Sequence, residues 1–345
     1  PYQNIYLSAF NDFTFTNYQS SKIDYFPYLT LNEDRLEGEV DNKVGAEIFW
    51  KIDSSRQLNA AFNPDFGQVE SDDVVVNFSA SETFYSDKRP FFSENHNLFN
   101  VQGSRFFYVI NTRRIGASPD YNCSEDFSLQ QELCEDSQKG ANDIDAAFRY
   151  TQQGENFDVG FLGAFEANEK FSEGKDFYAV RLRTKRDNLT VGYLGTYVNR
   201  PVIDRTAKVN ALDFEYRPSS IRRLSGTALA SDANGKTGYG FNLGYGHDPS
   251  KNRHNGVGVF YVDEDLDLKD MGYLWRNNLL MISGRASIKQ TDFSQGSITR
   301  ARKYEIAYSL KSTSDFEKEP SGFSFSAENS FTNTSEIKAE VFYRT

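Results

Sequence analysis

Carboxylates, cations and aromatic side chains crowd together between Phe62 and Phe99, and this stretch holds the residues most able to do chemistry. Asp65, Glu70 and Asp72 offer the oxygen ligands that a hard cation such as Ca²⁺ prefers. Their spacing matches no known calcium loop. Hydrogen-bonded structural carboxylates, paired with lysine or arginine, are therefore the favoured interpretation, and Ca²⁺ is the alternative. No other cofactor is expected.

Basic residues in the same stretch stand directly among acidic ones. Lys88 and Arg89 lie between Glu82 and Glu94, and the segment has prolines and no regular hydrophobic period. Such a segment cannot build a core of its own. It has to fold against a larger structure that pairs its backbone groups and its charges.

The two cysteines of the chain, Cys123 and Cys134, flank a polar, acidic loop predicted over residues 117–140. A disulfide between them is the favoured prediction and fits an oxidising compartment such as the periplasm or the cell surface. Free thiols are the alternative, because spacing alone does not establish the geometry of a disulfide.

Signatures of enzymes and of nucleic-acid binding are absent. The sequence has no Gly-x-Ser-x-Gly elbow, and its three histidines have no metalloprotease spacing. The net charge of −11 argues against nucleic acid, which requires a basic face. The chain is therefore predicted not to be an enzyme and not to bind nucleic acid.

Hydrophobic residues alternate with polar ones along most of the chain from residue 43 onward. The clearest example is residues 238–246, where Tyr239, Phe241, Leu243 and Tyr245 alternate with glycines and an asparagine. Alternating segments of about 9 to 12 residues match tilted strands that cross a membrane. The pattern predicts an all-β chain of about 14 to 16 antiparallel strands and no helix of any length.

Composition favours a membrane barrel over the alternative, a soluble β-sandwich or propeller. Aromatic residues make up 15% of the 345 residues, with 30 Phe and 20 Tyr. The mean hydropathy is nevertheless −0.62. An outward apolar face and an inward polar face produce this average. An open meander would leave unpaired edges in lipid, so closure into a transmembrane barrel is expected.

Charged residues on the predicted strands and loops allow two interpretations each. The row Arg181, Arg183 and Lys185 faces inward, either setting ion selectivity or forming a paired barrel wall. Residues 263–270 form an acidic run, either a loop folded inward or a solvated loop. In both cases the second interpretation is favoured.

The crowded stretch resembles the signature of a family of Gram-negative outer-membrane proteins. In that family, a domain like the family-9 carbohydrate-binding modules precedes a C-terminal β-barrel domain of unknown function (domain of unknown function 5916). The motif residues shared with the family are Asn63, Pro64, Asp65, Phe66, Gln68, Glu70, Asp72, Glu82, Lys88, Arg89, Pro90, Phe91, Phe92, Glu94, Arg113 and Arg114. Tyr85 and Ser93 depart from the family pattern, where Phe and Leu are usual.

The resemblance implies a location and a domain layout. It implies the outer membrane of a Gram-negative bacterium, with lipid and lipopolysaccharide as surroundings. Residues 1–42 would connect to an N-terminal domain that this chain lacks, and residues 43–345 would form the barrel. Residues 63–105 would be a plug or constriction folded into the lumen. The chain is expected to come from a longer, processed protein, with further strands after residue 345.

Three functions are compatible with this layout. The first is a channel or transport protein whose lumen holds the motif residues. The second is a carbohydrate-binding or carbohydrate-active surface protein, which the family's N-terminal domain suggests. The third is a platform for another secreted or surface-attached protein.

Overall fold

A computed structural model describes residues 21–34, 39–64, 84–101, 106–121, 141–168 and 172–345. Within these residues the only helical segments are short: α1 (Pro90–Ser93), η2 (His96–Phe99), η3 (Thr112–Arg114) and η4 (Pro201–Ile203). None of the described helices is long or apolar enough to cross a membrane.

Fifteen strands form one sheet, and two more form a small separate ribbon. The large sheet contains β1 (Lys22–Asp34), β2 (Glu39–Lys51), β3 (Arg56–Phe62), β5 (Ile144–Gln153), β6 (Phe157–Glu166), β7 (Asp176–Arg186), β8 (Leu189–Arg200), β9 (Arg205–Ser219), β10 (Arg222–Ala233), β11 (Lys236–Ser250), β12 (Arg253–Val262), β14 (Leu279–Gln290), β15 (Thr299–Ser312), β16 (Lys318–Phe331) and β17 (Glu336–Arg344). The ribbon pairs β4 (Phe107–Tyr108) with β13 (Tyr273–Leu274). The predicted all-β fold is confirmed, and the fifteen strands of the large sheet lie within the predicted 14 to 16, although the ribbon brings the described total to seventeen.

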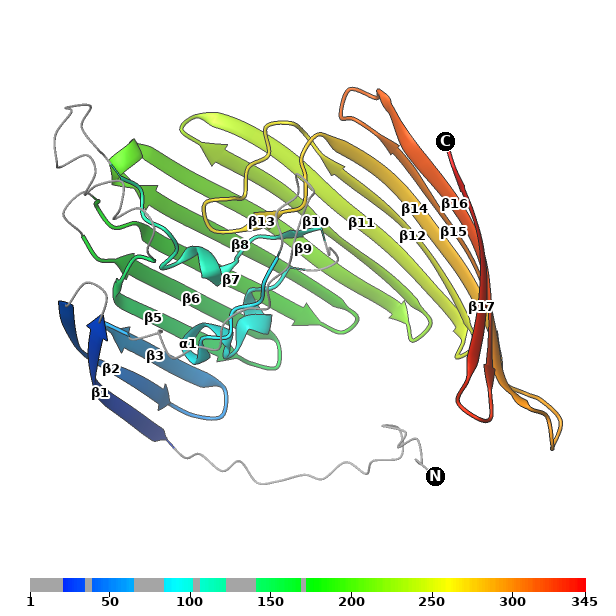
Figure 1. Cartoon of the computed structure of the whole chain (residues 1–345), viewed down its shortest axis with the longest axis horizontal. Coiled ribbons are helices and arrows are strands. Elements are labelled where there is room, and N and C mark those ends of the chain that lie inside the picture. Colours follow the sequence, from blue (N-terminus) through cyan, green and yellow to red (C-terminus); the bar gives the residue numbers. More distant parts are fainter. Residues whose placement is uncertain (1–20, 35–38, 65–83, 102–105, 122–140, 169–171) are drawn as a thin grey trace.

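The large sheet is an antiparallel meander in strict chain order, and it curls along its length (Figure 1). Two connections in it are long: residues 63–143 between β3 and β5, and residues 263–278 between β12 and β14. Among the described residues, β1 and β17 each pair with one neighbour and form the two edges. Closure of the sheet into a barrel stays a prediction.

The predicted connector over residues 1–42 is too long. Residues 22–34 form β1, which pairs with β2 from Lys22 opposite Lys51 to Asp34 opposite Glu39. Within β1, Ile23, Tyr25 and Leu29 are exposed at alternate positions as in the other strands, and backbone pairing with β2 brings this segment into the sheet.

The two faces of the sheet differ in composition and in burial. On β11, Tyr239, Phe241, Leu243 and Tyr245 are 40–57% exposed on the outer face. The residues between them on β11 point to the inner face, where Gly238 and Gly240 are buried. Side chains of successive strand residues point to opposite faces, so this alternation fixes the orientation of the whole meander.

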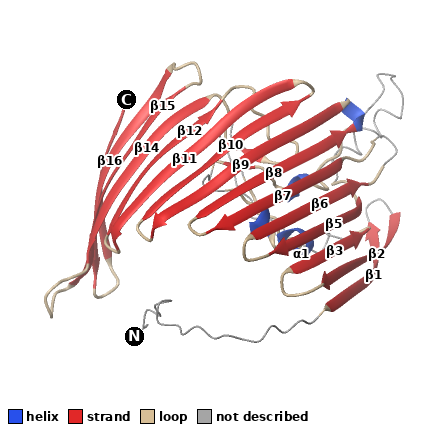
Figure 2. Ribbon diagram, turned by 180° about the vertical axis from the view of Figure 1, so that it is seen from behind, coloured by secondary structure: helices blue, strands red, loops and turns tan. Residues whose placement is uncertain are grey.

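The long connections fold back onto the inner face. The described parts of residues 84–121 are called the insert here, and residues 263–278 the strap. Figure 1 shows the insert in front of the strands, and Figure 2, viewed from behind, shows the strands in front of it. The two connections therefore cover one face of the sheet only.

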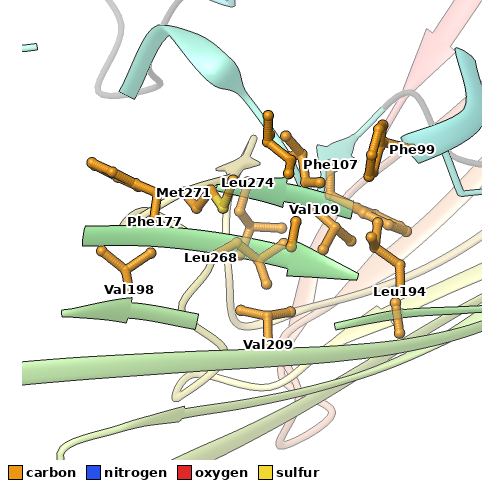
Figure 3. Close-up of a cluster of buried hydrophobic side chains, with 14 of the residues drawn as sticks. Phe99, Phe107, Val109, Phe177, Leu194, Val198, Val209, Leu268, Met271 and Leu274 are labelled. Atoms are coloured by element: carbon orange, nitrogen blue, oxygen red, sulfur yellow. The ribbon is translucent and has the colours of Figure 1, made fainter. Parts of the chain in front are cut away.

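A buried apolar core lies between the insert, the strap and the inner face of the sheet (Figure 3). Phe99 and Phe107 come from the insert, Leu268 and Met271 from the strap, and Phe177 from β7; each is at most 4% exposed. Both connections are part of the hydrophobic core of the fold, because their removal would expose this apolar surface to water.

Residues 106–110 contribute only the two residues of β4, which pair with the strap. One prediction about these connections is wrong. The acidic run 263–270, expected to be a solvated loop, is folded inward, with Leu266 and Leu268 at most 2% exposed. Its two leucines belong to the core, and Asp267 and Asp270 are paired with arginines at the rim of the sheet, as described below.

Candidate functional site

Arg89 joins the two halves of the insert. Its guanidinium donates to both carboxylate oxygens of Asp87 at 2.6–3.1 Å. It also donates to the carbonyls of Thr112 at 2.6 Å and Ile115 at 2.9 Å. It stacks on the ring of Phe92 at 4.3 Å. Arginine suits this position because its planar fork of donors satisfies a carboxylate and two carbonyls together.

Asp87 lies at the centre of these contacts and is ionised. Burial alone would raise the pKa of Asp87, but hydrogen bonds from Arg89 and Thr112 outweigh burial and lower the pKa below its ordinary value. Arg113 donates to the carbonyl of Ser86 at 2.9 Å, and Arg114 to the carbonyl of Gly272 in the strap at 3.2 Å. The motif around Arg89 and the motif at residues 113–114 therefore form one unit.

The helix α1 is fixed to the sheet wall by β5 and β3. Pro90 begins the helix, a position where its missing N–H is not needed. Arg149 of β5 donates to the carbonyl of Phe91, and its second terminal nitrogen lies 3.1 Å from Glu94 Oε2. The amide of Asn59 on β3 donates to the same Glu94 oxygen at 2.8 Å.

An ion pair inside the sheet wall holds η2. Arg181 of β7 and Asp213 of β9 are both buried, with Arg181 Nη2 3.0 Å from Asp213 Oδ2. Arg181 Nε also donates to the carbonyl of Leu98 at 3.1 Å. Between the two strands, Gly192 of β8 leaves the space for this pair, since a Cβ there would lie 2.6 Å from Arg181 Nη1.

The strap is held at the rim of the sheet by two arginines. Arg200 at the end of β8 contacts Asp120 and Asp270 at 2.8 Å each. Arg205 at the start of β9 contacts Asp270 at 2.7 Å and Asp267 at 2.8 Å. Burial would raise the pKa of Asp120 and of Asp270, but the arginine hydrogen bonds outweigh it and lower both pKa values.

Glycines on the inner face let the insert and the strap approach the strand backbone. A Cβ on Gly160 of β6 would lie 2.8 Å from the ring of Phe99. A Cβ on Gly238 of β11 would lie 2.1 Å from the backbone nitrogen of Leu266. At both positions a side chain would displace the covering segment.

The row of basic residues on β7 is paired with carboxylates, as the favoured interpretation predicted. Arg181 binds Asp213, while Arg183 and Lys185 both contact Asp158 of β6, at 2.6 Å and 2.9 Å. The inner wall beneath the insert therefore carries compensated charge.

Of the remaining predicted site residues, some are described by the structure and others are not. Asn63 ends β3 with φ 44°, and its carbonyl accepts from the Tyr28 hydroxyl at 2.9 Å; Pro64 follows it and is buried. Lys88 is exposed in the insert. The predicted residues that lie outside the described ones are Asp65, Phe66, Gln68, Glu70, Asp72, Glu82, Cys123 and Cys134. The Ca²⁺ and disulfide predictions therefore stay predictions, and the described residues contain no cluster of metal-ligating side chains.

Sequence reasoning missed four anchors on the strands: Arg149, Asp213, Arg200 and Arg205. Their only signal in the sequence is a charge at an inward position of an alternating strand. Three of these anchors bind carboxylates in the insert or the strap: Arg149 binds Glu94, Arg200 binds Asp120 and Asp270, and Arg205 binds Asp270. These partners lie 55 to 80 residues away along the chain.

Residues 20–176 match the model of a family described as "Domain of unknown function (DUF5916)". The predicted resemblance to this domain of unknown function is thereby confirmed, and the matched range contains the insert. The preceding domain like the family-9 carbohydrate-binding modules stays a prediction. Comparison with curated proteins gives no match.

Among solved structures, the chain is similar to OccK8 (OprE) of Pseudomonas aeruginosa, with 11% identity, a TM-score of 0.39, and coverage of 95% of this chain and 87% of that one. It is similar to OprD of Pseudomonas aeruginosa, with 10% identity, a TM-score of 0.37, and coverage of 94% and 80%. It is also similar to a porin, with 10% identity, a TM-score of 0.37, and coverage of 94% and 100%.

Removing one partner of the buried pair is expected to destabilise the protein strongly. Arg181→Met leaves the buried Asp213 carboxyl group without its partner in the wall and should lower the free energy of unfolding by about 3–5 kcal/mol. The double variant R181M/D213L should recover most of that loss. Denaturant unfolding measures both, with Arg186→Met at an exposed position as the control. Equal destabilisation by R181M and R186M would contradict the structural role of the pair.

Acid is expected to release the strap. Asp120 and Asp270 have pKa values lowered from 3.8, so their contribution to stability is complete above that value and is lost as the pH falls below it. Protection of the amides of residues 263–278 from hydrogen exchange, corrected for the pH dependence of the intrinsic exchange rate, should therefore fall as the pH drops below about 4, where ordinary aspartate titrates.

The variant D120N/D270N should show fast strap exchange already at pH 7, whereas the exposed control D187N should behave like the unmodified protein. Exchange of the strap that rises in parallel with that of all strands at acid pH would argue for global unfolding instead.

Proposed function

We propose, from the match of residues 20–176 to this domain of unknown function, that the chain forms an outer-membrane β-barrel that acts as a channel for hydrophilic solutes. The observation that supports it best is the division of the sheet into an exposed apolar outer face and a polar or covered inner face. A water-soluble sheet buries its apolar face, whereas a barrel in lipid turns that face outward.

The outer face has the composition that lipid requires. Strands β14 to β16 present isoleucine, leucine, tyrosine and phenylalanine outward, at 37–54% exposure. Ile282 stands opposite Leu310, Ile306 opposite Phe325, and Tyr308 opposite Phe323. These cross-strand pairs continue the apolar outer face from strand to strand.

Strand length also suits a membrane. Strands β5 to β12 contain 10 to 15 residues, and a tilted spanning strand needs about 9–11. The meander in chain order is the topology of outer-membrane barrels. Closure of β1 and β17, directly or through further strands, is part of this proposal, because an open edge in hydrocarbon leaves backbone groups unsatisfied.

The side chains and covering segments of the inner face would set the polarity and the width of the proposed channel. Over β3 to β9, and over the end of β10 to β12 that contains Ser231 and Gly238, it is covered by the insert and the strap, whose charges are paired with the wall. Over β14 to β17 it carries serines and charged pairs such as Lys303 with Glu305 at 2.9 Å and Lys338 with Glu340 at 3.0 Å. In the proposed barrel, the insert narrows one side of the lumen and a polar corridor remains along the other.

Carbohydrate binding gains no support from the tryptophans, the usual platform for sugar rings. Trp275 packs on Phe106 with ring centroids 5.6 Å apart, and Trp50 donates its indole N–H to Ser21 at 3.0 Å. The platform function for another protein stays a prediction.

Adjacent residues of β16 test the membrane part of the proposal. Phe325→Arg places a cation on the lipid face and should cost about 2–4 kcal/mol of folding free energy in lipid vesicles, whereas Ser326→Arg on the inner face should be tolerated. Heat-modifiable migration on a gel measures the folded fraction. Equal folding of the two variants would contradict a lipid-facing outer surface.

Planar bilayers test the channel part. Full-length protein should conduct, and R200Q/R205Q, which frees the strap from the rim, should conduct more because the covering segments narrow the lumen. The control R56Q/R186Q removes two positive charges at exposed turn positions. If the strap variant and the control have the same conductance, the strap is no constriction; if folded protein never conducts, the channel proposal fails.

A further inference from the structure

One part of the inner face is built differently from the rest. A groove of about 810 Å³ runs over the inner side of β10 to β16, beyond the insert. Its floor contains four glycines on two adjacent strands, Gly244 and Gly246 on β11 and Gly256 and Gly258 on β12. The register places Gly244 opposite Gly258 and Gly246 opposite Gly256.

These four glycines are not required by packing. A Cβ on any of them would find its nearest neighbour at 3.4–4.0 Å, so an alanine would fit. Beneath the insert and the strap the opposite holds: at Gly160 and Gly238 a Cβ would clash with the covering segment. Glycine within a strand weakens the strand and commonly marks close approach to a backbone or a ligand. Phe106 of the insert lines the groove, but the only described atoms within 4 Å of a Cβ on these four glycines belong to strands β10, β11, β12 and β14.

The register continues the floor into polar walls on both sides. On one row, Arg223 of β10 stands opposite Gly246, and Arg285 of β14 stands opposite Gly256. On the next row, Ser225 stands opposite Gly244 and Ser283 opposite Gly258, with Ser309 beyond it. The glycine floor is thus bordered by an arginine and a serine on each side, and Ser309 Oγ is a buried hydroxyl with no described partner.

The charge of the groove is positive although the chain as a whole is acidic. The basic residues that line it are Arg223, Arg285 and His254, and none of the lining residues is a carboxylic acid. Arg223 makes no ion pair with a described residue. Arg285 lies 3.3 Å from Glu305, but Glu305 is shared with Lys303 at 2.9 Å. His254 faces Asp248.

We propose that this groove is a binding site for a small oxyanion, a carboxylate- or phosphate-bearing solute, on its way through the lumen. Arg223 and Arg285 would bind its charged oxygens, the serine hydroxyls would donate to its other oxygens, and the glycine floor provides the room. Guanidinium groups and hydroxyls donate hydrogen bonds to the oxygens of such anions. The inference rests on the proposed channel and names its solute class.

Ion selectivity tests the inference, with chloride and inorganic phosphate as probes. Full-length protein in a bilayer with a KCl gradient should prefer chloride over potassium, and added phosphate should reduce the chloride current. In R223Q/R285Q the preference should fall by about threefold or more, because charged rings set the selectivity of a pore. The matched control R56Q/R186Q should keep both the preference and the phosphate effect.

A second variant probes the floor without changing any charge. Gly256→Leu fills the space between the two arginines, and the current should fall while heat-modifiable migration shows a folded barrel. A conducting protein that prefers potassium, or an R223Q/R285Q variant that matches the control, overturns the oxyanion site and leaves the channel standing. An unchanged current in G256L overturns the placement on the glycine floor. No current from folded unmodified protein overturns the channel itself, and the oxyanion route with it.

Discussion

The structure depends on the pairing of charge between the inner face of the sheet and the segments that fold over it. The insert brings carbonyl groups and carboxylates into a place where water is largely excluded. Arg149 and Arg181 donate to its carbonyls, and Arg200 and Arg205 hold the strap at the rim. Unpaired, these groups would be costly to bury. The fold can therefore keep an irregular segment against a regular sheet only where the strands supply the matching donors.

Glycine divides the inner wall into two regions. Where the insert and strap lie, glycines such as Gly160 and Gly238 avoid side chains that would clash with Phe99 or Leu266. Where no covering segment lies, Gly244 and Gly256 leave open space instead. The same residue type thus permits a close protein contact in one region of the inner face and a polar groove in the other. Arg223, Arg285, Ser225 and Ser283 border the open region and give it its donor character.

The strands and the orientation of their two faces could be predicted from the sequence, because both depend on the alternation of apolar and polar residues along the chain. Tyr239 to Tyr245 were predicted to share one face, and the structure exposes all four aromatic and aliphatic side chains there. Pairing of the basic row on β7 was also predictable, since an inward cation needs a counter-charge. The wrong predictions concern segments whose partners are remote. The acidic run 263–270 was predicted to be a solvated loop because its partners are remote in the sequence. Arg205, which binds Asp270, and the residues that bury Leu268 are not neighbours of the run in the chain.

The sequence by itself determined the all-β class, the number of strands, the orientation of their faces and the segment that could not be a strand. Each of these follows from the two-residue period of a strand and from its interruption, which are properties of neighbouring residues. Only the tertiary structure decided which carboxylate meets which arginine, that the strap belongs to the core, and that four glycines face open space. Those features arise from the register of strands and from segments folded across them, and both bring together residues that are far apart in the chain.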